Sequence, residues 1–136
     1  MKYLFVIAIA ISLIQCSPKL APDAYWGRSR WVLVEMKGVP VQQSGGRRDA
    51  YIEFDTEQKL FTGNGGCNQI NGSYTLDKNS VQFRDVNSTK MLCGDMEFEK
   101  VFLAELANVN RYEIRGEDLV LKKKKNVVLV LRARRY

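Results

Sequence analysis

Short apolar blocks separated by polar turns run through most of the chain. The blocks occupy residues 31–36, 50–54, 59–63, 71–76, 80–83, 111–114, 119–121 and 127–131, and several of them alternate apolar and polar positions. Polar groups such as Asp77-Lys78-Asn79 and Gly116-Glu117-Asp118 stand between them as turns. Turn signals about every ten residues are typical of barrels and sandwiches. We therefore predict a mainly β fold, a small antiparallel β-barrel-like or sandwich domain of seven to eight strands.

One stretch, at about residues 95–108, has the period of a helix instead. Its apolar positions are three to four residues apart and fall mostly on one helical face: Phe98, Val101, Phe102, Leu106 and Val109. Asp95 suits the N-cap position. Glu97, Glu99 and Lys100 lie off the apolar face. The sequence predicts one α-helix that closes or packs one end of the barrel, with a partner-binding helix as the alternative.

The N-terminus has the pattern of a signal peptide. Lys2 precedes an unbroken apolar run at residues 3–11, and the run ends near Gln15. A positive charge before about a dozen apolar residues is typical of secretory signal peptides, whereas a spanning helix needs about 20. A buried core helix would show one polar face, which this run lacks. We predict that residues 1–15 are a signal peptide.

Leu13-Ile14-Gln15-Cys16 resembles the lipobox of bacterial lipoproteins. The resemblance implies that Cys16 is acylated and anchors the mature chain to a membrane of the bacterial cell envelope. Ser17 resembles the signal for sorting to the outer membrane. Gln15 stands where a small residue is usual, so a plain secreted protein is the alternative.

The residues after Cys16 predict a tether and then a single domain. Residues 17–23 contain two prolines and no periodicity, which favours an extended tether over an edge strand. We place a lipidated tether at residues 16–28 and one domain at residues 29–136. A chain of 136 residues has room for one domain of ordinary size.

Composition excludes several kinds of chemistry. The chain has no histidine, which removes His-dependent triads, His general bases and His metal ligands. Three cysteines without histidine do not complete an ordinary four-ligand zinc site. The carboxylates form no convincing acid–base pair. We expect no catalytic residue, no metal and no cofactor, and therefore not an enzyme. The net charge of +6 does not indicate nucleic acid in an exported protein.

The glycine-rich segment at residues 63–68 holds the first of the two remaining cysteines. It lacks the Lys and Ser or Thr of a phosphate loop, so we expect a tight turn or bulge that aims Cys67 and Asn68 inward. Asn68 would then hydrogen-bond loop backbone. Outside the inner membrane Cys67 and Cys93 either form a disulfide or pack as two reduced thiols.

Four consecutive lysines, Lys122, Lys123, Lys124 and Lys125, stand between two apolar blocks. They predict a solvated hairpin whose lysines protect a sheet edge from aggregation. The alternative is contact with anionic headgroups or lipopolysaccharide, since clustered lysines near a membrane add affinity. Arg132, Arg134 and Arg135 could extend the same basic patch.

Several ordered motifs resemble the META domain family, the HslJ-type heat-shock lipoproteins. The resemblance runs from about Arg30 to Leu131 and rests on an opening tryptophan strand, a Gly-Cys-Asn signature followed by Gly-Ser-Tyr, a Thr-x-Met-x-Cys element and a helix. The motif residues are Trp31, Gly66, Cys67, Asn68, Gly72, Tyr74, Thr89, Met91, Cys93, Glu99 and Phe102. The resemblance implies a β-barrel-like domain with one helix, no catalytic residues, a role in stress or drug tolerance, and Cys67 with Cys93 as a matched pair.

Two functions are compatible with these observations. The first is an interaction or stabilising module of the envelope, which binds a protein partner or an anionic lipid surface. The second is a small-ligand or lipid carrier that uses the barrel mouth. Aromatic side chains that could fill the interior argue against a roomy cavity: Trp31, Phe54, Phe61, Tyr74, Phe83, Phe98 and Phe102.

Overall fold

A computed structural model of the chain describes residues 23–42, 49–94 and 96–135. The predicted signal peptide, Cys16 and Asp95 lie outside these residues. The elements are, in chain order, η1 (Trp26–Arg28), β1 (Arg30–Met36), β2 (Tyr51–Asp55), β3 (Leu60–Asn64), β4 (Gln69–Asp77), β5 (Ser80–Ser88), α1 (Met96–Asn108), β6 (Arg111–Arg115), β7 (Asp118–Lys123) and β8 (Asn126–Arg134).

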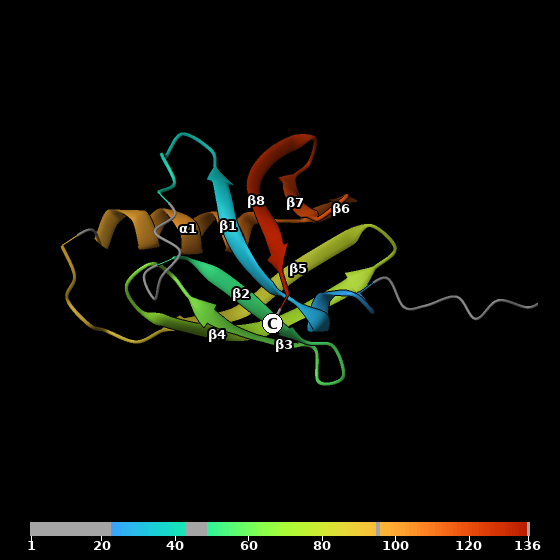
Figure 1. Ribbon diagram of the computed structural model, residues 1–136, viewed down its shortest axis with the longest axis horizontal. Helices are drawn as coiled ribbons and strands as arrows, with labels where there is room; N and C mark the ends of the chain where they lie inside the picture. Colours follow the sequence, from blue (N-terminus) through green and yellow to red (C-terminus); the bar gives the residue numbers. More distant parts are fainter. Residues whose placement is uncertain (1–22, 43–48, 95, 136) are drawn as a thin grey trace, which may run out of the picture.

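The eight described strands form one antiparallel sheet in the order β5-β4-β3-β2-β1-β8-β7-β6. Figure 1 shows the sheet curling on itself, with α1 beside it, and the helix packs against β5 and β8. The two edge strands approach each other at one end, where the Tyr112 amide donates to the Asn79 carbonyl at 3.0 Å. The prediction of a mainly β, barrel-like domain with one helix is confirmed. The sheet is a curled half-barrel and not a two-sheet sandwich.

The eight predicted blocks correspond to β1–β8, and β5 differs most in length. Its apolar run stops at Phe83, but the strand continues to Ser88 because β4 is long enough to pair with it. Residues 84–88 are mostly polar, so apolar pattern alone could not extend the strand. The full strand reaches from the turn at Lys78 and Asn79 to the loop that begins at Thr89.

Gly72 on β4 lets an aromatic ring lie flat over the sheet. It pairs in register with Phe61 on β3, and a Cβ at position 72 would lie 2.7 Å from both the Phe61 ring and the Arg84 carbonyl oxygen. Real side chains do not approach this closely. The glycine of the family motif is therefore required by packing.

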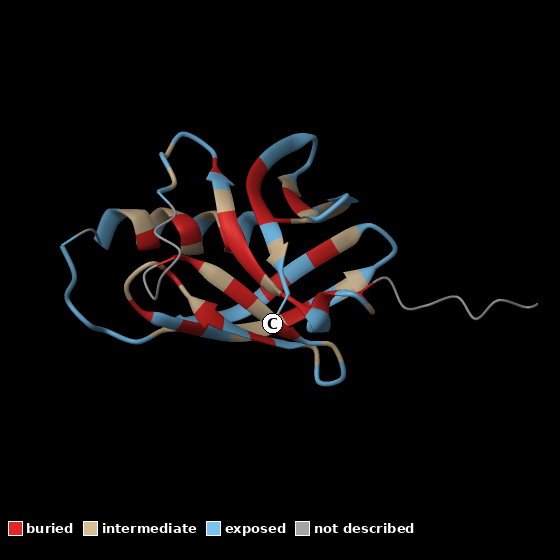
Figure 2. Cartoon of the chain, viewed as in Figure 1, coloured by how far each residue is buried: buried red, intermediate tan, exposed pale blue. Residues whose placement is uncertain are grey.

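The concave side of the sheet holds the hydrophobic core. Figure 2 shows buried positions alternating with exposed ones along the strands. Of the seven aromatic residues expected inside, six are buried and belong to the core cluster: Trp31, Phe54, Phe61, Tyr74, Phe83 and Phe102. Phe98 is partly buried and packs against that cluster. Side chains therefore fill the interior of the half-barrel.

The N-terminal part of the described chain packs into this core. Trp26 is fully buried and contacts the rings of Phe54, Tyr74 and Tyr112, with centroids 4.6, 5.7 and 5.0 Å away. The buried Asp23 carboxylate accepts hydrogen bonds from Tyr74 Oη at 2.8 Å and Lys59 Nζ at 2.6 Å. Residues 23–28, which the sequence pattern assigned to the tether, thus lie in the domain. The Trp26 side chain is the physical reason.

Candidate functional site

The Gly-Cys-Asn signature forms the hairpin turn between β3 and β4. The Gly65 amide donates to the Asn68 carbonyl at 2.8 Å, and Gly66 has a φ of +109°, which L residues rarely adopt. The turn directs Asn68 into the protein, where it is buried. Cys67 differs from the expectation, because it stays half-exposed at the tip of the turn.

Asn68 connects this turn to the loop after β5. Its Oδ1 accepts hydrogen bonds from the Met91 amide at 2.7 Å and the Thr89 hydroxyl at 2.9 Å, and its Nδ2 donates to the Met91 carbonyl at 3.3 Å. The side chain therefore bonds to loop backbone, but the loop is the one after β5 and not the glycine-rich segment itself. Asn68, Thr89 and Met91 thus form one hydrogen-bonded unit that holds residues 89–91 in place.

Glu99 on α1 completes the unit from the opposite side, although the sequence pattern placed it off the apolar face of the helix. Only 4% of Glu99 is exposed. Its carboxylate accepts hydrogen bonds from the Asn68 amide at 2.6 Å, the Cys67 amide at 3.3 Å and Asn68 Nδ2 at 2.9 Å. A Cβ at Gly65 would lie 2.8 Å from Glu99 Cγ, so the glycine leaves room for the acid. The spacing did hold a signal, since Glu99 lies three residues before Phe102 and seven before Leu106.

A disulfide joins Cys67 to Cys93, with the two Cα atoms 6.0 Å apart. It closes the same loop that Asn68 holds through Met91. Between these two anchors lies Leu92, which is 95% exposed, next to Met91 at 55%. The signature residues therefore fix a short loop that displays two apolar side chains. We call residues 89–94 the clamped loop.

The other residues of the family motif are structural. Trp31, Tyr74 and Phe102 lie in the core, and Gly72 lies under Phe61. Burial and the hydrogen bond to Asp23 raise the pKa of Tyr74 well above its ordinary value, which keeps the hydroxyl neutral. The residues of the family motif thus either belong to or hold the clamped loop, or take part in the packing of the core.

The four lysines form the predicted hairpin, at the turn from β7 to β8. They protect no sheet edge, however, because β6 pairs with the outer side of β7 and is itself the edge strand. Lys122 forms an ion pair with Glu113, which also binds Arg115 Nε at 2.8 Å. The hydrogen bonds from Arg115 and then Lys122 lower the pKa of Glu113 to about 2.

Arg111 joins the lysines through strand pairing, which the pattern of residues along the chain did not reveal. It faces Lys122 in the β6–β7 register. In the described part of the chain Arg111, Lys124 and Lys125 form no ion pair. These three residues, with Asn79 and Tyr112, line a concave region of about 550 Å³. We call it the basic pocket.

Arg132, near the C-terminus, does not extend this patch. Arg132 pairs in register with Asp118, at the far end of the β7–β8 hairpin from the lysine turn. Its guanidinium binds the Asp118 carboxylate at 2.8 Å, which lowers the pKa of Asp118. The expectation that Arg132, Arg134 and Arg135 continue the basic patch is therefore wrong for Arg132, because register separates it from the lysines.

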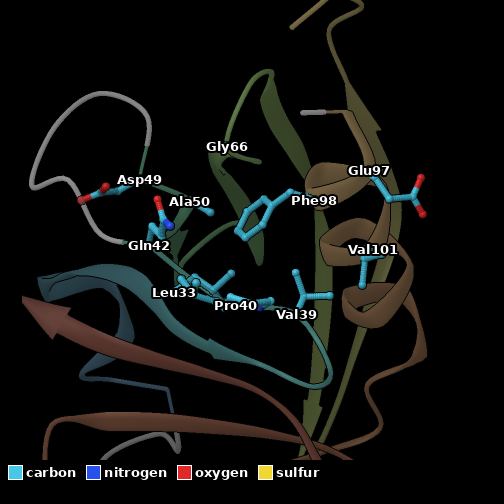
Figure 3. A pocket seen from close by; sticks show the side chains of 11 residues that line it. Leu33, Val39, Pro40, Gln42, Asp49, Ala50, Gly66, Glu97, Phe98 and Val101 are labelled. Carbon is cyan, nitrogen blue, oxygen red and sulfur yellow. The ribbon is translucent and has the colours of Figure 1, made fainter. Parts of the chain in front are cut away.

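A second concave region, also of about 550 Å³, lies between α1 and the segment after β1. Figure 3 shows Phe98 and Val101 of the helix facing Leu33, Val39 and Pro40. The carboxylates of Asp49 and Glu97 at its rim point away from the hollow in this view. We call it the apolar cavity. It adjoins the core, since Leu33 and Ala50 of its lining belong to the core cluster.

Neither a membrane-spanning helix nor a metal cluster is found in the described residues. Residues 23–42, 49–94 and 96–135 contain no helix long and apolar enough to cross a bilayer. The same residues contain no group of three or more His, Cys, Asp or Glu side chains placed to hold a metal ion.

Comparisons with known proteins agree with this geometry. An NMR structure of a protein from Burkholderia xenovorans matches 88% of this chain and 96% of its own, with a TM-score of 0.67 and 21% identity. A crystal structure of a DUF4847 family protein from Bacteroides vulgatus matches 84% of this chain and 98% of its own, with a TM-score of 0.59 and 16% identity. No curated protein matches the chain. The model of the META domain matches residues 25–135, and the chain therefore belongs to the META domain family.

Proposed function

We propose that this protein is a non-enzymatic lipoprotein of the bacterial cell envelope. In this proposal acyl chains on Cys16 anchor it to the outer membrane, and the domain acts as an interaction or stabilising module during heat or drug stress. The stress role comes from the resemblance to heat-shock lipoproteins. The observation that carries the proposal is a cluster of cations without a carboxylate partner in the described residues, which lies beside Tyr112, a residue whose ring contacts Trp26 near the start of the described chain.

Contacts around Tyr112 support this placement. Tyr112 lines the basic pocket and its ring contacts the buried Trp26, three residues after Asp23. From Cys16 to Asp23 the chain has seven Cα–Cα steps, which span at most about 25 Å. An anchor on Cys16 would therefore hold the basic pocket close to the membrane surface. Clustered lysines at that distance bind anionic headgroups, each contributing about 1 kcal/mol.

The buried polar groups support a non-enzymatic function. Glu99 and Asn68 bond to each other and to the clamped loop, and Asp23 bonds to Tyr74 and Lys59. Each of these polar side chains already has structural partners. A catalytic acid or base instead needs to be within hydrogen-bond reach of a substrate proton.

Membrane fractionation and vesicle sedimentation test the proposal. Mass spectrometry of the protein from its own membranes should find acyl chains on Cys16. A chain of residues 17–136 keeps the whole core cluster, which begins at Trp26, and should bind vesicles of phosphatidylglycerol. Replacing Lys123, Lys124 and Lys125 with Gln should weaken that binding about 100-fold, since three contributions of about 1 kcal/mol are lost.

A control variant of equal net charge separates this surface from bulk attraction. Lys37, Lys90 and Lys100 are exposed and lie outside the basic pocket. Replacing these three with Gln should leave vesicle binding within about threefold of the wild type. Equal losses in both variants, or an unmodified Cys16, would refute the proposal.

The apolar cavity favours a second candidate function, a carrier of a small apolar ligand. Its volume of about 550 Å³ is within the range of ligand sites, and Phe98, Val101 and Val39 give it an apolar lining. Native mass spectrometry of the protein from its own membranes should then show an extra mass that leaves on denaturation. Replacing Val101 with Trp would fill the cavity and should abolish that mass.

A further inference from the structure

The basic pocket is a built concavity and more than a patch of surface lysines. Three segments border it and form its walls: the edge strand β6, the β7–β8 turn, and the turn before β5 that carries Asn79. The Tyr112 hydroxyl donates to the Lys78 carbonyl at 2.8 Å, and the Tyr112 amide donates to the Asn79 carbonyl at 3.0 Å. These two bonds join the walls, so the pocket keeps its shape without a ligand.

The lysine turn is held in place as well. Lys124 has a φ of +59°, and its amide donates to Asn110 Oδ1 at 2.8 Å. Asn110 immediately precedes Arg111, so one contact fixes the backbone at both cations relative to each other. A fixed arrangement of cations loses less conformational entropy on binding an anion than free lysines do.

The charges in the pocket are unbalanced. Arg111, Lys122, Lys124 and Lys125 line it together with one carboxylate, Glu113. Glu113 is already bound by Lys122 and by Arg115. Arg111, Lys124 and Lys125 are left facing the hollow without an opposite charge in the described part of the chain. A ligand with two negative charges would relieve their mutual repulsion.

We infer that the basic pocket is a binding site for a phosphate monoester. Such a group carries nearly two negative charges at neutral pH and three strong acceptor oxygens. The planar Arg111 guanidinium can hold two of these oxygens as a fork, Lys124 and Lys125 supply the remaining charge, and the Asn79 amide can donate as well. This inference rests on the proposed function, which places the pocket at the membrane surface. The monoester it binds is the phosphate of a lipid headgroup.

Titration with inorganic phosphate tests the site itself. The probe is added to residues 17–136 at constant ionic strength, and backbone amide resonances are followed by NMR. We expect saturable shifts at Arg111, Tyr112, Lys124 and Lys125. Replacing Arg111 with Gln should weaken binding about tenfold, and Lys should restore only part of it, because Lys keeps the charge but loses the fork. The exposed Lys37→Gln variant should bind as the wild type does.

Glu113→Gln tests the site by a substitution that should strengthen phosphate binding. This substitution frees Lys122 and Arg115 and removes the carboxylate that repels the ligand, so phosphate affinity should rise several-fold. The Glu113 side chain lies at the surface of the edge strand, so the variant should fold. Unchanged or weaker affinity, or non-saturable shifts spread over all surface cations, would overturn the inference.

Vesicles distinguish the source of the phosphate. At equal surface charge, vesicles with phosphatidic acid, a monoester, should bind more tightly than vesicles with phosphatidylglycerol, a diester, and Arg111→Gln should remove the difference. Saturable binding of inorganic phosphate without vesicle binding would support the phosphate site but refute the membrane contact. The ligand would then be a soluble phosphate ester. Vesicle binding without saturable phosphate binding would support the membrane contact of the proposed function and refute the phosphate site.

Discussion

Replacing Glu99 with Gln should destabilise the protein, although the two side chains are nearly equal in size. Glu99 Oε2 accepts from the amides of Cys67 and Asn68, and Oε1 accepts from Asn68 Nδ2. A glutamine has one acceptor oxygen, and directing it at the two amides leaves its NH₂ group facing Asn68 Nδ2. The Asn68 side-chain amide cannot flip to present its oxygen to this NH₂ group, because Oδ1 already accepts hydrogen bonds from Met91 and Thr89.

The loss of stability in Glu99→Gln depends on which hydrogen bonds are lost and which are weakened. A hydrogen bond to a charged group contributes about 1.5–3 kcal/mol and one between neutral groups about 0.5–1.5 kcal/mol. The Glu99→Gln variant would lose one charged bond and weaken two, which costs roughly 4 kcal/mol in all. Removing a buried charge returns some of this, of the order of 1–2 kcal/mol. We expect the free energy of unfolding to fall by about 2–3 kcal/mol.

Urea unfolding followed by tryptophan fluorescence measures this change, since Trp26 and Trp31 both lie in the core. Glu97→Gln is the matched control on the same helix. The Glu97 side chain is 73% exposed and makes a 3.5 Å ion pair with Lys100, so its loss should cost less than about 0.5 kcal/mol. Amide hydrogen exchange at Cys67 and Asn68 should accelerate only in Glu99→Gln. Unfolding free energies that agree within about 0.5 kcal/mol for the two variants would refute the reasoning.

Three further predictions concern stability. Gly72→Ala should lower the free energy of unfolding by about 1–3 kcal/mol, because its Cβ would lie 2.7 Å from Phe61 and from the Arg84 carbonyl. Gly94→Ala is the control, since no atom lies near its Cβ. Thermal unfolding compares the two variants. Replacing both Cys67 and Cys93 with Ser should cost roughly 3–4 kcal/mol for a separation of 26 residues, with a loss near zero counting against the loop-closure argument. Glu113 and Asp118 have lowered pKa values in the folded protein, so the stability they contribute is present above their ordinary pKa values and is lost as the pH falls toward 2. Urea midpoints between about pH 2 and 6 should vary less with pH in a Glu113→Gln, Asp118→Asn variant, and equal slopes would contradict the assignment.

Local pattern was sufficient for the fold class, because it carries the two-residue period of strands and the three-to-four-residue period of a helix. It did not decide between a barrel and a sandwich. Alternation and turn residues located eight strands, and spacings of three and four located α1. The same reasoning failed where a polar side chain is buried or where a core residue lies in a polar segment. Glu99 is an acid on the buried face of its helix, and its partners are 31 and 32 residues away. Trp26 was assigned to the tether because the preceding prolines dominated the composition.

The basic pocket could not be predicted without strand register. Arg111 is separated from the lysines by a whole strand in sequence, and the pairing of β6 with β7 brings it opposite Lys122. Register also removes Arg132 from the patch, although in sequence Arg132 lies closer to the lysine run than Arg111 does. The sequence alone treats all these basic residues alike. The structure shows that Lys122 and Arg132 form ion pairs, whereas Arg111, Lys124 and Lys125 form none in the described residues.

The geometry of β5 sets the family motif apart from the proposed binding surface. The strand has nine residues, so about 30 Å separates its ends. The basic pocket borders the end that begins after Asn79, and the clamped loop comes after the other end at Ser88. Sites this far apart without shared partners act additively. The signature residues therefore set the stability of the domain and the shape of the clamped loop, while the cations at the opposite end can bind an anion without altering either.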